Sequence, residues 1–143
     1  MNQAELIVTE KISEAFNGVK PKTGAYDFES WQEIPDSWLS ENEDIFAYYS
    51  HADELFLLPA YLCFLLRTDK DDPESQIYMN ISNTLTQYSK EKTVSCFKNS
   101  LSVEQFSAVK AFIKHFTHNK SVNLDLEQWN KTLSNWTRIE KKI

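Results

Sequence analysis

The sequence has few of the residues that form tight turns, disulfides and phosphate-binding loops. Only two of its 143 residues are glycine and only two are cysteine. Glycine-rich phosphate loops need several glycines close together, so this class of nucleotide site is not expected. The cysteines form no Cys-x-x-Cys pair, and the motifs of serine hydrolases, dinucleotide-binding folds, P-loop enzymes and zinc proteases are missing. We therefore predict no cofactor, no metal ion and no catalytic residues, although an enzymatic activity stays open.

Long apolar segments are missing as well. The longest apolar run covers 55–66 and contains Pro59, whereas a membrane-spanning helix needs roughly 20 apolar residues. The first residues carry no basic stretch followed by an apolar one, which a signal peptide would require. We expect a cytoplasmic protein that does not bind membranes. Cys63 is expected to be a buried, reduced thiol, because its neighbours in sequence are large and apolar.

Acidic residues outnumber basic ones. The chain has 21 aspartates and glutamates against 15 lysines and arginines, which gives a formal net charge of -6 and a pI of about 5.1. Such a charge repels the nucleic-acid backbone and favours basic partners. We therefore predict a protein partner with a basic surface and no nucleic acid. The alternative is that the charge serves solubility alone. The sequence leaves the oligomeric state open.

Helical periodicity dominates the chain, and we predict an all-α fold: a single domain over 1–143 with about five to seven helices. The predicted helices include 4–17, 73–88, 103–118 and 125–141. Gly18 suits the left-handed position that ends the first helix, and Ser102 and Gln105 have capping-box spacing. The apolar stripes of the last two helices are Val103, Phe106, Val109, Phe112, Ile113 and Phe116, and Leu126, Trp129, Leu133 and Trp136. Residues 89–100 show no clear pattern.

Residues 26–39 are rich in aromatic side chains but follow no single period. We expect them to form a wrap across the helices, with a short helix over 28–33 capped by Asp27 and a further turn opened by Pro35. The wrap must bury most of its aromatic side chains, because it would otherwise expose a large apolar patch.

The stretch 44–67 holds the densest run of large apolar residues and is predicted to form the buried centre of the fold. A proline inside a helix removes one backbone hydrogen bond and costs about 3 kcal/mol. Either the helix kinks at Pro59, or one helix ends near Phe56 and another begins with Pro59 in its first turn. Residues 60–67 are apolar nearly all round, which predicts that neighbours cover this segment on all sides.

Acidic and tyrosine side chains gather just before the apolar segment and at its start. Acids speed the encounter with a basic protein, and rigid aromatic side chains supply contact area. The candidate partner-binding residues are Glu41, Glu43, Asp44, Tyr48, Tyr49, Asp53 and Glu54. The alternative is that the acids face water and the tyrosines face the core.

A second hypothesis places a small-ligand pocket or an active site beside a helix break at Pro59. A broken helix frees backbone carbonyls that could face a ligand, and His51 and Tyr61 are the candidate pocket residues. Two further histidines, His115 and His118, are three residues apart near a helix end. They have no third metal ligand with suitable spacing, so we interpret them as a solvated helix terminus.

The order of these segments resembles a family of small uncharacterised bacterial proteins. In that family an aromatic-rich segment, here 46–49, runs into a Leu-Pro-Ala-Tyr-Leu element, here 58–62. A tryptophan-containing stretch precedes it, and a Leu-Ser/Thr-x-Glu-Gln helix start follows, here 101–105. The resemblance implies a compact helical bacterial domain in which Pro59, Ala60 and Tyr61 are structural. It implies no activity.

Small size, acidity, many aromatic residues and the missing catalytic motifs together favour a non-enzymatic binding protein. The most concrete form of this hypothesis is a bacterial immunity protein that neutralises a basic toxin through its acidic surface. The alternative is a ligand-binding protein or enzyme with its pocket beside Pro59.

Overall fold

The computed structural model describes residues 2–21, 26–43, 53–68, 76–88, 101–118 and 126–141. Within these ranges the chain forms six α-helices and one 3-10 helix, with no β-strand. They are α1 (Gln3–Ala15), η1 (Trp31–Glu33), α2 (Asp36–Glu41), α4 (Glu54–Arg67), α5 (Gln76–Tyr88), α7 (Val103–His118) and α8 (Leu126–Glu140). The predicted all-α fold is confirmed for these residues.

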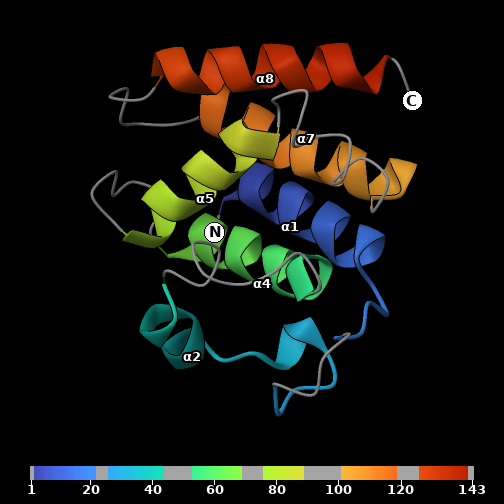
Figure 1. Ribbon diagram of the computed structural model, residues 1–143, viewed down its shortest axis with the longest axis vertical. Helices are drawn as coiled ribbons and strands as arrows, with labels where there is room; N and C mark the ends of the chain where they lie inside the picture. Colours follow the sequence, from blue (N-terminus) through green and yellow to red (C-terminus); the bar gives the residue numbers. More distant parts are fainter. Residues whose placement is uncertain are drawn as a thin grey trace.

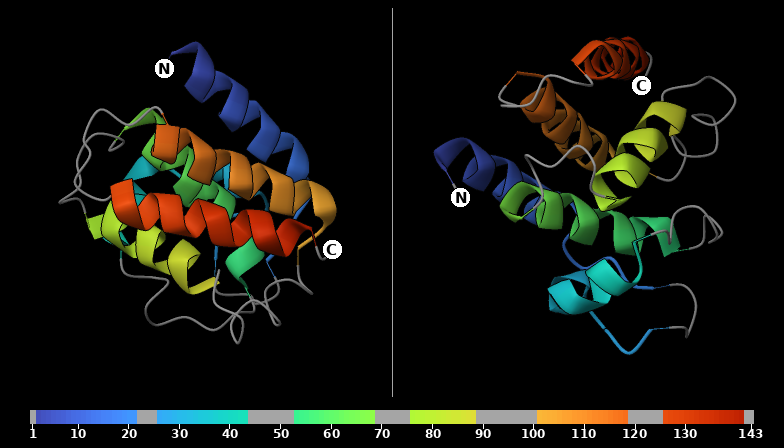
Figure 2. Two further views of the ribbon diagram at one scale, coloured as in Figure 1. Left: turned by 90° about the horizontal axis from the view of Figure 1, so that it is seen from above. Right: turned by 90° about the vertical axis from the view of Figure 1, so that its left-hand side faces the viewer.

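The helices are stacked along the long axis of the molecule (Figure 1). α8 crosses one end, and η1 and α2 lie at the opposite end. Figure 2 shows α5 and α7 on different sides of the molecule beneath α8, with α4 below them. α4 packs against α1, α5, α2 and η1, while α8 packs against α7 and α5. Four elements therefore pack directly on α4, the most apolar segment of the chain, while α7 packs between α1 and α8.

Neighbours cover α4 on all sides, since every residue from 56 to 66 is buried. The helix runs through Pro59 without a break, so the alternative of two separate helices is wrong. Pro59 has no N–H to donate to the carbonyl of Leu55, four residues earlier, which costs about 3 kcal/mol. Burial of each large apolar side chain contributes about 1.5–3 kcal/mol. Packing around the helix thus outweighs the loss at Pro59.

Local sequence signals fix where two helices begin. The amide of Glu5 donates to the side-chain oxygen of Asn2 at 2.9 Å, and the amide of Asn2 donates to the carboxylate of Glu5 at 2.9 Å. At the start of α7 the predicted capping box is confirmed, with contacts of 3.0 and 3.1 Å between Ser102 and Gln105. Gly18 follows α1 with a φ of 80°, the left-handed conformation that was predicted.

Most members of the predicted apolar stripes are buried; the exceptions are the first residue of each helix and Leu133 of α8, which is partly buried. Phe106 and Phe116 of α7 are buried, but Val103 is 67% exposed. On α8, Trp129 is buried, whereas Leu126 is 36% exposed. Val103 and Leu126 are the first residues of their helices. Helical side chains tilt toward the N-terminus, so a first residue points past the helix end instead of onto a neighbouring helix.

The aromatic segment crosses one face of α4, as predicted. Trp31, Ile34 and Leu39 are buried against the core. The other aromatic side chains of the segment, Tyr26, Phe28 and Trp38, are only partly buried, so the expected burial of its aromatic residues is incomplete. The indole N–H of Trp31 donates to the carbonyl of Phe16 at 2.9 Å, which connects this segment to the end of α1.

The short helices differ in detail from the prediction. η1 is shorter than the expected helix over 28–33, and Ser30 caps it instead of Asp27. Ser30 directly precedes the helix, so its hydroxyl reaches the amide of Gln32 at 3.3 Å. Pro35 immediately precedes α2, in agreement with the predicted turn.

Other predictions lie outside the described residues. They concern the proline start of the helix at 73 and the structure of residues 89–100. Among the helices that the structure does describe, none combines the length and apolar character needed to cross a membrane.

Candidate functional site

The segment that forms η1 and α2 carries the charge imbalance of the whole chain. Residues 26–43 contain six acidic residues and no lysine or arginine, and all six are exposed. The rest of the chain has 15 acidic and 15 basic residues, so its charges cancel. The six acidic residues of this segment therefore account for the net charge of -6. We call 26–43 the acidic layer. Its acidic residues are Asp27, Glu29, Glu33, Asp36, Glu41 and Glu43.

An arginine of α4 connects the acidic layer to the core. Arg67 forms an ion pair with Asp36, the first residue of α2, and its guanidinium lies 5.7 Å from the ring centroid of Phe64. The two charged side chains are 35% and 52% exposed. An ion pair this exposed to water contributes at most about 1 kcal/mol. The ion pair joins the last residue of α4 to the first residue of α2.

Two hydrogen bonds connect the other end of α2. The hydroxyl of Tyr61 in α4 donates to the backbone carbonyl of Asn42 at 2.6 Å. The side-chain amide of Asn80 in α5 donates to the backbone carbonyl of Glu43 at 2.7 Å. α4 and α5 therefore both bind the backbone at the end of the acidic layer. The layer lies at the end of the molecule opposite α8 (Figure 1).

The predicted partner-binding residues do not all share one surface. Glu41 and Glu43 are exposed in the acidic layer. Asp53 is only 5% exposed, and Glu54 is half-buried and hydrogen-bonded to Tyr88 of α5. The remaining partner-binding candidates, Asp44, Tyr48 and Tyr49, lie outside the described residues. Whether any of these residues binds a partner stays a prediction.

The contact between Glu54 and Tyr88 is internal. Burial raises the pKa of Tyr88 well above its usual range, and the hydrogen bond to Glu54 and the charge of its carboxylate raise this pKa further. Tyr88 therefore remains protonated and can donate to Glu54. This carboxylate connects α4 with α5 and differs from the exposed acids at 41 and 43.

Sequence reasoning missed four members of the acidic layer: Asp27, Glu29, Glu33 and Asp36. The signal was present, because a segment of 18 residues with several acids and no basic residue is visible in the sequence. Aromatic residues of the wrap stand between these acids, so the segment lacks the compact acidic run found just before the apolar segment. Only the fold establishes that all of them are exposed on one layer.

The second hypothesis places a pocket beside Pro59. Pro59 lies inside the uninterrupted helix α4 and is buried, as is Ala60. Tyr61 is 1% exposed, and its hydroxyl is used in the contact to the carbonyl of Asn42. No observation on the described residues favours a ligand at this position. The pocket hypothesis stays a prediction, since His51 lies outside them.

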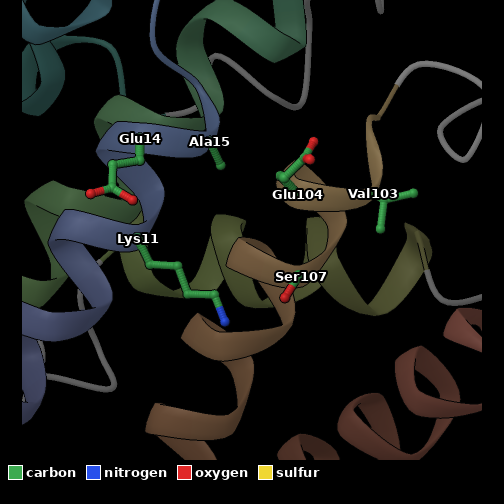
Figure 3. A pocket seen from close by; sticks show the side chains of 6 residues that line it. All are labelled: Lys11, Glu14, Ala15, Val103, Glu104 and Ser107. Atoms are coloured by element: carbon green, nitrogen blue, oxygen red, sulfur yellow. The ribbon is translucent and has the colours of Figure 1, made fainter.

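A pocket of about 450 Å³ does lie elsewhere, between the second half of α1 and the start of α7 (Figure 3). It is lined by Lys11, Glu14, Ala15, Val103, Glu104 and Ser107. A serine nucleophile needs a hydrogen-bonded base that accepts its proton. No hydrogen bond joins Ser107 to a base in the part of the chain that the structure describes. The lining therefore does not point to nucleophilic catalysis.

The two histidines and the described cysteine do not form a reactive group. His115 is 8% exposed with its ring 5.8 Å from that of Phe116, whereas His118 is exposed. The expected solvated helix terminus is thus wrong for His115. Across the described ranges, no group of three or more histidine, cysteine, aspartate or glutamate residues could hold a metal ion. Burial raises the pKa of the Cys63 thiol to about 11, against a smaller opposing effect of Arg67, so the thiol is protonated.

Comparison with known proteins gives a family but no activity. No curated protein and no solved structure matches the chain. The profile of a protein family matches residues 7–140, which is nearly the whole chain and includes every described helix apart from the first turn of α1. The chain therefore belongs to DUF6714, a family of unknown function.

Proposed function

We propose that this protein is a non-enzymatic binding domain whose acidic layer docks onto a basic surface of another protein. The observation that carries the proposal is the set of six exposed carboxylates on a segment without lysine or arginine. Only Asp36 forms an ion pair with another described residue, namely Arg67. The other carboxylates are therefore available to a partner.

In such a complex, charge would mainly raise the association rate and orient the two proteins, and it would contribute less to the affinity. Each exposed ion pair contributes about 0.2–1 kcal/mol, and complementary potentials raise the association rate. The acidic layer suits this role because Tyr61 and Asn80 hold its backbone from α4 and α5. A carboxylate on a fixed backbone loses less conformational freedom when it binds than one on a loose chain.

The most concrete form of the proposal is a cytoplasmic bacterial immunity protein that neutralises a basic toxin. Acidity and small size support it, as does the missing catalytic group among the described residues. We also propose that the Leu-Pro-Ala-Tyr-Leu element of 58–62 marks the family. Its residues are buried in α4, and its tyrosine holds the acidic layer.

Binding to the product of the adjacent upstream gene tests this function. Glu33→Gln, Glu41→Gln and Glu43→Gln combined remove three exposed charges from the acidic layer. We expect the affinity to fall about tenfold, since three lost ion pairs of about 0.5 kcal/mol each amount to roughly 1.5 kcal/mol, and about 1.4 kcal/mol corresponds to a factor of ten. The loss should shrink as the salt concentration rises.

The matched control removes three exposed glutamates elsewhere, by Glu10→Gln, Glu14→Gln and Glu127→Gln. This variant has the same net charge and should bind within about twofold of the wild type. Equal weakening by both triple variants would show that overall charge matters and the acidic layer does not. A neighbouring product that does not bind would argue against the immunity role.

A further inference from the structure

Trp38 differs from the other three tryptophans of this chain. Trp31, Trp129 and Trp136 are 4%, 3% and 1% exposed. Their indole N–H groups donate to the carbonyl of Phe16, the hydroxyl of Tyr78 and the carbonyl of Leu85, at 2.9, 2.7 and 3.1 Å. Trp38 is only partly buried, and its indole donates to none of the residues that the structure describes. Tryptophan is enriched among the interface residues that contribute most to binding, so a partly exposed indole is a candidate anchor.

Trp38 lies in the acidic layer beside two other aromatic rings. Its ring is 5.9 Å from those of Tyr26 and Phe28, at interplanar angles of 78° and 85°. Edge-to-face packing of this kind holds the indole in one orientation. Glu41 follows Trp38 by three residues in α2, so the two side chains are neighbours on the helix surface. An exposed carboxylate and a fixed indole thus occur side by side.

One guanidinium of the protein already combines a carboxylate of the acidic layer with an aromatic ring of α4. Arg67 pairs with the carboxylate of Asp36 and lies over the ring of Phe64. Guanidinium groups suit such a combination because they are planar, weakly hydrated and able to stack on aromatic faces. A lysine ammonium is more strongly hydrated and gains less from an aromatic ring.

We infer that the partner of the acidic layer presents an arginine, whose guanidinium stacks on Trp38 and pairs with Glu41. This inference rests on the proposed function and specifies the chemistry of the partner surface. The acids of the layer attract any basic surface, whereas the indole selects arginine over lysine. Trp38 is the specificity-determining residue and Glu41 is its charged neighbour.

Two capped peptides of equal charge, hexa-arginine and hexa-lysine, test the inference on the full chain at low salt. We expect hexa-arginine to bind about two- to fivefold more tightly, from one cation–π contact. The ratio should fall to about one in Trp38→Leu, which keeps apolar bulk without a ring. In proton–nitrogen NMR spectra, hexa-arginine should shift the Trp38 indole resonance and leave those of the three buried tryptophans in place. Trp38→Phe identifies the resonance, so the result in the wild type does not depend on a disruptive variant.

The outcomes separate the inference from the proposed function. A Trp38 resonance that does not move, or an arginine preference that survives in Trp38→Leu, would overturn the inference. The inference would also be overturned if the wild type bound both peptides equally and the triple variant Glu33→Gln, Glu41→Gln and Glu43→Gln bound both more weakly. In that case the acidic layer would remain a binding surface. If the triple variant binds both peptides as well as the wild type does, the proposed function fails together with the inference.

Discussion

Replacing Tyr61 with phenylalanine should loosen the acidic layer while leaving most of the core in place. The substitution keeps a ring that is 1% exposed and deletes the hydroxyl that donates to the carbonyl of Asn42 at 2.6 Å. Losing such a hydrogen bond costs about 0.5–1.5 kcal/mol, and leaving the carbonyl without its donor adds to this cost. We expect the free energy of unfolding to fall by about 1–2 kcal/mol, and the melting temperature by about 3–7 °C for a domain of this size.

Asn80→Ala removes the adjacent contact, the hydrogen bond of 2.7 Å to the carbonyl of Glu43, and completes a double-mutant cycle. Because both contacts hold the same chain end, the second loss should cost less once the first has occurred. We expect a coupling free energy of about 0.5 kcal/mol or more.

Urea unfolding of the wild type, the two single variants and the double variant measures the cycle. Amide hydrogen exchange should also rise across 36–43 in each variant and stay unchanged in α7. Additive losses would refute the idea that the two hydrogen bonds fix one segment. Exchange that rises equally in α7 would show that Tyr61 stabilises the whole core instead of the layer.

Two further predictions concern buried groups. Tyr78→Phe removes the acceptor of the Trp129 indole N–H, a contact of 2.7 Å between side chains that are 1% and 3% exposed. The free energy of unfolding measured in urea should fall by about 1–3 kcal/mol. A loss below about 0.5 kcal/mol would contradict the importance of this contact. Burial raises the pKa of Cys63 from 9.0 to about 11, with an opposing effect of Arg67, so the unfolded chain loses this proton first as the pH rises. The stability of the wild type relative to Cys63→Ala should therefore be constant below about pH 9 and fall by up to about 2–3 kcal/mol by pH 11. Parallel curves of stability against pH for the two proteins would exclude a buried thiol.

The helical architecture could be predicted because its signals are local. The repeat of Phe106, Val109 and Phe116 shows which face of α7 is buried, and the Ser102–Gln105 pair shows where that helix begins. Apolar residues nearly all round 60–67 indicated that α4 lies at the centre. These inferences depend on spacing along a helix, which the sequence displays directly.

The candidate site could be predicted only in part, because exposure depends on contacts between distant segments. The sequence places Asp53 and Glu54 beside the other acids, but the fold buries Asp53 and brings Glu54 to Tyr88. Trp31 and Trp38 lie seven residues apart in one irregular segment. No local pattern indicates that Trp31 is sealed against Phe16 while Trp38 reaches the surface.

The sequence by itself determined that this chain is helical, which segment is central and that residues 26–43 contain acids without basic residues. Periodicity and composition are properties of the chain, so no tertiary contact is needed to read them. Tertiary structure alone decided that Pro59 remains inside one helix, that Tyr61 and Asn80 hold the acidic layer, and that Trp38 stays partly exposed. Each of these outcomes depends on which surfaces meet across the fold, and packing free energy summed over many side chains decides that.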